Sequence, residues 1–247
     1  MNRLKVREAV HHVLYTFDQD LQWYLRRCSV EDSLERKKAM AIVLRAVLDA
    51  RVRMLAPFAP YVCEEIWEKM GGPGFVSKAE WPKHDDKMID LTIEGAESII
   101  ESTLDDTANI AKATKIKAKN VYYYTSAQWK WRVYLKALER AEAGRLSSSE
   151  IMRELVADAE MKRGAEELAK FVQKCCDDLF KMAPDMRRSR LQAGIIDEFE
   201  VLKAAGDFYK KETDAEVKVY REDDTEKYDP KNRAQLAQPY RPAIYIE

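Results

Sequence analysis

Apolar side chains recur every three or four residues along the first part of the chain, a spacing that places them on one face of an α-helix. This pattern predicts helices over residues 2–27, 33–56 and 61–70, with Ser33 as an N-cap of the second. Three amphipathic helices with short joints pack as a bundle. We therefore expect a helical bundle over residues 1–82.

Residues 83–93 are polar and lack a helical period, which predicts a linker. Beyond it, helical patterns alternate with short runs rich in β-branched and aromatic residues. The expected helices lie at about 95–118, 127–143, 148–158, 161–182 and 195–212, and the expected strands at 121–125, 216–220 and 243–246. The predicted fold class is therefore mainly α, a helical bundle followed by an α+β domain of about three strands over 94–247.

Composition is that of a globular protein, with 247 residues, 46% hydrophobic and 34% charged. The chain has no apolar run near the ~20 residues that span a bilayer and no signal-peptide layout, so we expect no membrane partner. Its four cysteines form no CxxC pair. That usage is typical of a reduced protein, and we expect a cytoplasmic location.

Catalytic and metal-binding patterns are missing from the sequence. The three histidines are His11, His12 and His84, and the first two are neighbours that cannot converge on one ion. No nucleophile elbow, phosphate-binding glycine loop or dinucleotide fingerprint is present. We expect no catalytic residue, no metal site and no cofactor in this chain.

Charge is unevenly distributed, although the net charge is only −1. Residues 85–106 hold eight acids against one lysine, and residues 107–138 hold seven bases and no acid. Within the basic block, Lys112, Lys115 and Lys119 have the spacing of one helix face. Arg132 and Lys136, with Arg140 just beyond the block, make a second stripe. Five aromatic residues lie between the stripes: Tyr122, Tyr123, Tyr124, Trp129 and Trp131.

Basic side chains interleaved with aromatic rings favour nucleic-acid binding, because cations neutralise phosphates and exposed rings stack on bases. The competing interpretation is a solvated basic face over a buried tyrosine strand, with lysines placed favourably at a helix C-terminus. The residues alone leave both open. The short cluster Arg187-Arg188-Ser189-Arg190 is open to the same two interpretations.

Residues 54–67, Met-Leu-Ala-Pro-Phe-Ala-Pro-Tyr-Val-Cys-Glu-Glu-Ile-Trp, resemble a signature of the anticodon-binding helical domain in class I synthetases for leucine, isoleucine, valine and methionine. There a helix ends in an Ala-Pro-Phe-x-Pro turn, and the next helix carries Glu-Glu-x-Trp. Residues 23–27 and 79–82 fit the same domain. The prolines redirect the chain, and we expect Trp67 and Phe58 to wedge between helices.

The second region is similar to the C-terminal domain of archaeal and eukaryotic leucyl-tRNA synthetases. Three segments carry this similarity: 119–131, 170–174 and the final 241–247. The resemblance implies an enzyme that joins leucine to tRNA with ATP and magnesium. The ATP-binding motifs of that class are missing here, so we expect this chain alone to be inactive. Met1 would then be an added start.

In the leucyl family, the archaeal C-terminal domain reaches the long variable arm of tRNA, with the chain's tail near its tip. Carried onto this sequence, the resemblance implies tRNA(Leu) as partner, no DNA, and an elongation factor or other synthetases as further candidate partners. The same region of a valyl, isoleucyl or methionyl enzyme, or a protein-interaction module, are the alternatives. The predicted tRNA contacts are Lys112, Lys115, Lys119, Trp129, Lys130, Arg132, Lys136, Arg187, Arg188, Arg190, Tyr245, Ile246 and Glu247.

Overall fold

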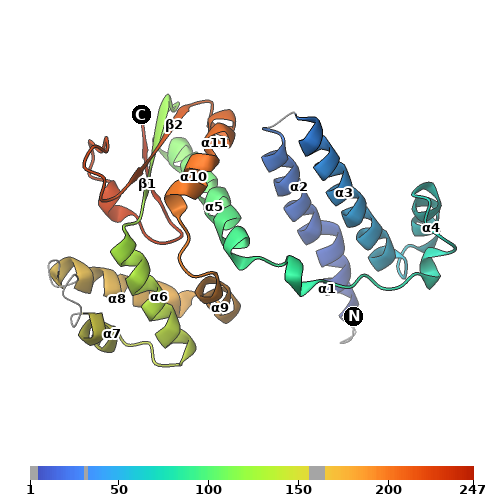
Figure 1. Cartoon of the computed structure of the whole chain (residues 1–247), viewed down its shortest axis with the longest axis horizontal. Helices are drawn as coiled ribbons and strands as arrows, with labels where there is room; N and C mark the ends of the chain where they lie inside the picture. Colours follow the sequence, from blue (N-terminus) through green and yellow to red (C-terminus); the bar gives the residue numbers. More distant parts are fainter. Residues whose placement is uncertain (1–4, 31–32, 156–164) are drawn as a thin grey trace. The chain divides into compact units, whose positions relative to one another are not determined.

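The computed structural model describes residues 5–30, 33–155 and 165–247, which divide into two compact units, Met1–Asp86 and Lys87–Glu247 (Figure 1). Parts of the expected helices, at residues 2–4, 156–158 and 161–164, lie outside the described residues. The predicted fold class is confirmed, since the chain is mainly helical with a three-stranded sheet.

The first unit is made of helices. In chain order they are α1 (Val6–His11), a π-helical turn η1 (His12–Thr16), α2 (Phe17–Cys28), α3 (Leu34–Leu55), α4 (Pro60–Lys69) and a 3₁₀ turn η2 (Val76–Lys78). The Ser33 side chain accepts a hydrogen bond from the amide of Arg36, which confirms it as the N-cap of α3. Pro60 starts α4, where its missing amide hydrogen removes no helical bond.

Trp67 organises the core of this unit, as the sequence predicts. It is 6% exposed and packs in a cluster with Val52, Ala56, Cys63 and Val76. Phe58, expected to wedge between helices, is instead 39% exposed, because it stands in the turn between α3 and α4 rather than on either helix.

The π-helical turn η1 is held from α3. Arg51 donates to the carbonyl oxygens of Val13 at 3.1 Å and Leu14 at 2.9 Å, and its guanidinium pairs with Asp18 at 3.1 Å. Widening a helix by one residue disturbs its regular hydrogen bonding, and these donors satisfy carbonyls in the widened turn. The hydrophobic period does not reveal this turn, which falls inside the single helix predicted over 2–27.

The second unit surrounds its sheet with helices. They are α5 (Leu91–Thr114), α6 (Gln128–Glu142), α7 (Ser148–Leu155), α8 (Ala165–Lys181), α9 (Pro184–Ala193), α10 (Glu198–Ala204) and α11 (Gly206–Thr213), with 3₁₀ turns η3 (Asp86–Met88) and η5 (Ala234–Leu236). Helix α5 begins at Leu91 behind the N-cap Asp90, inside the expected linker. Helix α9 lies outside the helices expected from the sequence; Pro184 occupies its first turn, where the missing amide hydrogen removes no helical bond.

The sheet has the strand order β2-β1-β3, with β1 (Asn120–Thr125) at its centre (Figure 1). Strand β2 (Glu216–Arg221) runs parallel to β1, and β3 (Ala243–Ile246) runs antiparallel to it. All three strands were expected. Because paired residues point to the same face, Val121 and Tyr123 lie toward one side, and Tyr122 and Tyr124 toward the other.

Helices cover the first of these faces. The Tyr123 hydroxyl lies 3.0 Å from that of Thr107 on α5, and its ring packs on Tyr209 of α11. Helices α10 and α11 lie beside β2, visible in orange in Figure 1. Burial raises the pKa of the Tyr123 hydroxyl above its ordinary range.

Glu198, at the start of α10, is a buried carboxyl that ties three segments together. It is 2% exposed. One oxygen accepts from the amide and hydroxyl of Ser126 after β1, at 3.2 and 3.0 Å, and the other from the amide of Tyr240 at 2.7 Å. Burial raises the pKa of this carboxyl to about 7, against hydrogen bonds that lower it.

Lys130 on α6 is the buried cation of this unit. Its side chain is 3% exposed, and its ammonium donates to Glu222 at 2.7 Å and to the carbonyls of Gln235 and Ala237 at 2.8 Å each. All three of its donors are used. Lys130, one of the predicted tRNA contacts, is thus committed to contacts within the protein, where it fastens the 222–237 connection to α6.

We predict that stability depends on pH through Glu198. Its folded pKa of about 7 exceeds the ordinary value near 4.5, so the folded state holds the proton more tightly. The free energy of unfolding should then fall as pH rises from about 4.5 to 7, by up to about 3 kcal/mol. Urea unfolding at pH 5 and pH 8 measures this change.

In Glu198→Gln that pH dependence should disappear, although the amide donor, facing the two backbone amides, lowers stability at both pH values. Glu200→Gln, an exposed position on the same helix, is the control and should keep the wild-type pH dependence. An unchanged dependence in Glu198→Gln would contradict the assignment.

A second prediction separates Lys130 from its neighbour Lys136. Lys130→Met should lower the free energy of unfolding by about 3–5 kcal/mol, because it leaves Glu222 buried without its cation. Lys136 lies on the same helix, and Lys136→Met, which removes its half-exposed ion pair with Glu154 of α7, should cost about 1 kcal/mol or less. Adding Glu222→Gln to Lys130→Met should recover part of the loss. Equal costs at positions 130 and 136 would refute the structural role of Lys130.

Candidate nucleic-acid interface

Three exposed lysines gather where α5 ends and β1 begins: Lys112, Lys115 and Lys119. The spacing predicted that they share one helix face. They do not, because α5 ends at Thr114 and Lys115 takes a left-handed conformation with φ 56°. Within the residues that the structure describes, none of the three has an ion pair.

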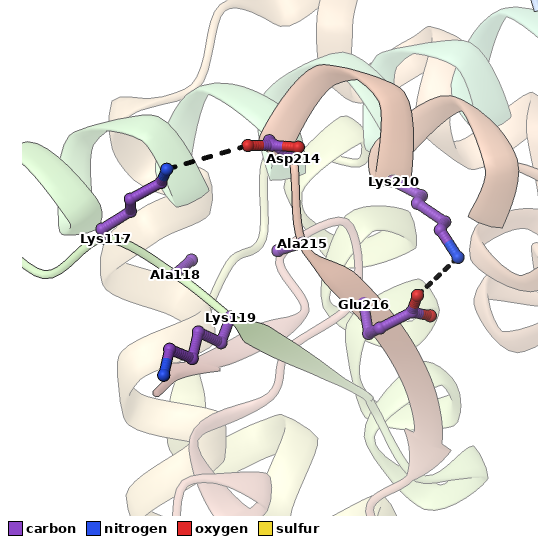
Figure 2. Close-up of a pocket in the computed structure, with 7 residues that line it drawn as sticks. All are labelled: Lys117, Ala118, Lys119, Lys210, Asp214, Ala215 and Glu216. Atoms are coloured by element: carbon purple, nitrogen blue, oxygen red, sulfur yellow. Dashed lines mark hydrogen bonds and ion pairs between the residues drawn. The ribbon is translucent and has the colours of Figure 1, made fainter.

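Beside them lies a surface hollow of about 460 Å³, shown in Figure 2. Lys117 faces Asp214 at 3.9 Å, and Lys210 pairs with Glu216 at 2.5 Å. The Lys119 side chain points away from Glu216 (Figure 2), although the Lys119 carbonyl accepts a hydrogen bond from the Glu216 amide at 2.9 Å. The hollow therefore holds two cations that face carboxylates, and Lys119, whose ammonium has no ion pair with any residue that the structure describes.

The second basic stripe is largely neutralised from outside its own helix. Lys136 pairs with Glu154 of α7 at 3.2 Å, and Arg140 pairs with the same carboxylate. Arg132 is exposed, while Trp129 is half-buried with its ring edge-on to Phe171 at 5.3 Å. Of this stripe, Arg132 is the residue best placed to reach a ligand.

The arginine cluster on α9, among the predicted tRNA contacts, turns mainly inward. Arg187 donates to the carbonyl of Leu179 in the last turn of α8 and to that of Met182 just after the helix, and it pairs with Glu142. Arg190 donates to the hydroxyl of Tyr134 at 2.9 Å, and its guanidinium lies over the ring of Tyr240 at 4.1 Å. Both are thereby occupied inside the protein.

Arg188 is the exposed member of that cluster, and it pairs with Asp185 one turn earlier on the same helix. A pair between exposed residues three apart is weak and exchanges readily with water. The α9 cluster therefore offers one available guanidinium instead of three.

Five rings form a tyrosine cluster on the second face of the sheet: Tyr122, Tyr124, Tyr220, Tyr228 and Tyr245. Their centroids are 4.9 to 6.5 Å apart. The two rings of β1 are buried, as the second sequence interpretation foresaw, whereas Tyr228 is 45% exposed and Tyr220 and Tyr245 are half-buried. The outer rings present aromatic surface to solvent.

The tail is ordered by the sheet. Ile246 is 7% exposed, and the backbone of Glu247 exchanges two hydrogen bonds of 3.0 Å with Asn120. The Glu247 carboxylate accepts from Tyr122 at 2.9 Å and Tyr228 at 3.2 Å. Burial, and then this carboxylate, raises the pKa of Tyr122 to about 12. The tail is therefore fixed as a strand of the sheet, and Ile246, one of the predicted tRNA contacts, belongs to the core.

Sequence reasoning missed the neighbours that the fold brings to the tyrosine cluster. Lys218 is paired in register with Tyr122, so its exposed ammonium lies on the same face as the rings. Tyr220 follows it two residues later, and Tyr228 arrives from the polar 222–242 connection. The period of two in 216–221 is a signal for Lys218 and Tyr220, but Tyr228 has no local signal.

No cluster of His, Cys, Asp or Glu among the described residues could hold a metal ion. The four cysteines are free and buried. Burial raises the pKa of the Cys175 thiol to about 12, so this thiol is protonated at neutral pH. No described helix is both long and apolar enough to cross a membrane.

Comparison with known proteins places these features in a family. Residues 1–123 match the family described as the anticodon-binding domain of tRNA ligase. This match runs past the first unit, through α5 and into β1. Leucine–tRNA ligases match over the full chain: that of Methanococcoides burtonii is 33% identical, and those of Pyrococcus abyssi and Pyrococcus horikoshii are 36% and 37% identical.

These matches cover 100% of this chain but only 23–24% of each relative, so the chain spans about a quarter of the length of the curated relatives it matches. The match to the anticodon-binding family includes the Trp67 core, and the matches to leucine–tRNA ligases include the sheet and the tyrosine cluster. Residues 1–123 therefore belong to the anticodon-binding domain family of tRNA ligases, and along its whole length the chain is homologous to archaeal leucine–tRNA ligases.

Proposed function

We propose that this chain is the part of a leucine–tRNA ligase that binds tRNA(Leu) and positions it through its backbone and long variable arm. In the parent protein, another region uses ATP and magnesium to ligate leucine in the cytoplasm, and this chain alone is inactive. Matches to leucine–tRNA ligases over the whole of this chain favour leucine over the valyl, isoleucyl or methionyl alternatives.

The observation that carries the proposal is the set of unpaired lysines at the α5–β1 junction. Lys112, Lys115 and Lys119 are exposed and lack an acidic partner in the described part of the chain. A lysine without an acidic partner breaks no existing ion pair when it binds a phosphate. Its binding also releases counterions that were condensed on the nucleic acid. Paired cations such as Lys136 must first leave Glu154.

The tyrosine cluster supplies the second kind of contact. Exposed rings stack on unpaired bases, and stacking is worth about 1–3 kcal/mol per base. Lys218 and Tyr245 flank Tyr122 on the same face of the sheet, and Tyr228 packs on Tyr122 and Tyr245. That face therefore offers a cation for the phosphate and aromatic surface for the base. Glu247 is held by tyrosine hydroxyls, and its carboxylate could also accept from a base amino group.

The lysine junction gives a direct test. Lys112→Ala, Lys115→Ala and Lys119→Ala together should lower affinity for a long-arm tRNA by about tenfold at about 100 mM salt, and reduce the slope of log K against log salt by up to about 3. Filter binding over a salt series measures both quantities. The control replaces Lys170, Lys181 and Lys203 by Ala, an equal charge change elsewhere on the unit. If the control variant loses as much tRNA affinity as the test variant, the effect comes from net charge and not from the lysine junction.

Selectivity tests the variable-arm part of the proposal. Equal affinity for a short-arm tRNA, or no binding of either at about 50 mM salt, would exclude it.

A point change at Tyr245 tests stacking without removing β3. Tyr245→Ala should weaken tRNA binding by about 1–2 kcal/mol with little change in salt slope, because a ring and no charge is lost. Tyr245→Phe keeps the ring and should bind as wild type. If both variants bind as wild type while remaining folded by circular dichroism, Tyr245 is only a structural part of the sheet.

A further inference from the structure

A groove of about 490 Å³ lies between α5 and the outer side of β3, away from the lysine junction. Its apolar lining comes from Ile110 and Ala113 of α5, from Leu236 in η5, and from Ile244 of β3. Leu236 is 52% exposed, although it stands beside other apolar side chains. None of the proposed tRNA contacts uses this groove.

The β3 edge beside this groove has free backbone groups. Asn120 and Glu247 exchange both of their backbone hydrogen bonds, and such pairs alternate along an antiparallel ladder. Tyr245 and Ala243 therefore bond to β1, whereas the amide and carbonyl groups of Ile244 and Ile246 point outward. In the described part of the chain, no strand pairs with this edge.

Charge around the groove has one prevailing sign. Lys174 of α8, Arg233 and Arg241 line it, against Asp106 as the acid. Asp106 lies 3.9 Å from Arg241, whereas Lys174 and Arg233 have no ion pair within the described residues. The groove therefore carries two uncompensated cations above an apolar floor.

We propose that this groove binds an extended acidic segment of another protein, which adds a strand to the free edge of β3. The free edge of β3 presents amide donors and carbonyl acceptors in alternation, which a peptide backbone complements. A nucleic-acid backbone does not, because it offers no matching row of donors. Side chains of an added strand alternate between two sides. Apolar residues pack over Ile110 and Ala113, and acidic residues reach the cations. This inference goes beyond tRNA binding and does not depend on it.

The test uses the full 247-residue chain and a blocked hexapeptide of alternating glutamate and valine, with a lysine–valine hexapeptide as charge control. Isothermal titration calorimetry should show the acidic peptide binding at least about tenfold tighter than the basic one. Equal binding of the two peptides would overturn the proposal.

Ile244→Pro tests the edge itself. It deletes an outward amide that β1 does not use, so the sheet should survive while peptide affinity falls by about tenfold. Lys174→Glu with Arg233→Glu tests the charge and should weaken the acidic peptide by a similar factor. This second variant keeps the proposal falsifiable if Ile244→Pro does not fold. Unchanged affinity in folded Ile244→Pro and in the charge-reversal variant would overturn it.

Controls separate the groove from other occupants. Lys115→Glu with Lys119→Glu should weaken tRNA binding and leave peptide binding unchanged, so the two proposals can fail separately. If Lys174→Glu with Arg233→Glu weakens tRNA and not the peptide, the groove belongs to the tRNA surface. If the chain dimerises in sedimentation and Ile244→Pro abolishes the dimer, a second copy occupies the edge. Either result would overturn the peptide proposal.

Discussion

The pairing of β1 on both sides is the constraint on which the second unit depends. Its residues from Val121 to Thr125 are all buried, with helices against one face and the tyrosine cluster against the other. Glu198 then accepts hydrogen bonds from Ser126, immediately after β1, and from Tyr240, shortly before β3. The strand thus sets where the lysine junction begins, which tyrosines face outward, and which edge of β3 stays open.

Much of this architecture follows from local sequence. The strands were predictable to within one residue at either end, because runs such as Val121 to Thr125 contain β-branched and aromatic residues between polar stretches. The Trp67 core was predictable from its motif. Two features were not predictable from local sequence: the start of α9 at Pro184 and the widened helical turn η1. Both depend on contacts with other segments, made by Arg187 for α9 and by Arg51 for η1.

The candidate site was harder to predict, because charge along the chain does not represent charge in space. Residues 107–138 contain no acid, yet Glu154 and Glu222 arrive from distant segments to pair with Lys136 and Lys130. Lysines 130 and 136 look alike in sequence, and only tertiary burial makes one structural. Conversely, Lys218 joins the tyrosine cluster through a strand pairing that no local pattern specifies.

The order of the strands also bears on how the second unit folds. The hydrogen bond from Thr125 to Tyr220 spans 95 residues, and the one from Asn120 to Glu247 spans 127. Contacts this distant in sequence cost loop-closure entropy before they stabilise anything, and they slow folding. During synthesis, β1 leaves the ribosome long before either of its partners exists. The helices between β1 and β2 can form from local contacts, but the tyrosine-rich β1 stays unpaired until β2 and β3 have been synthesised. An unpaired apolar strand is the segment most prone to aggregate or to be bound by a chaperone.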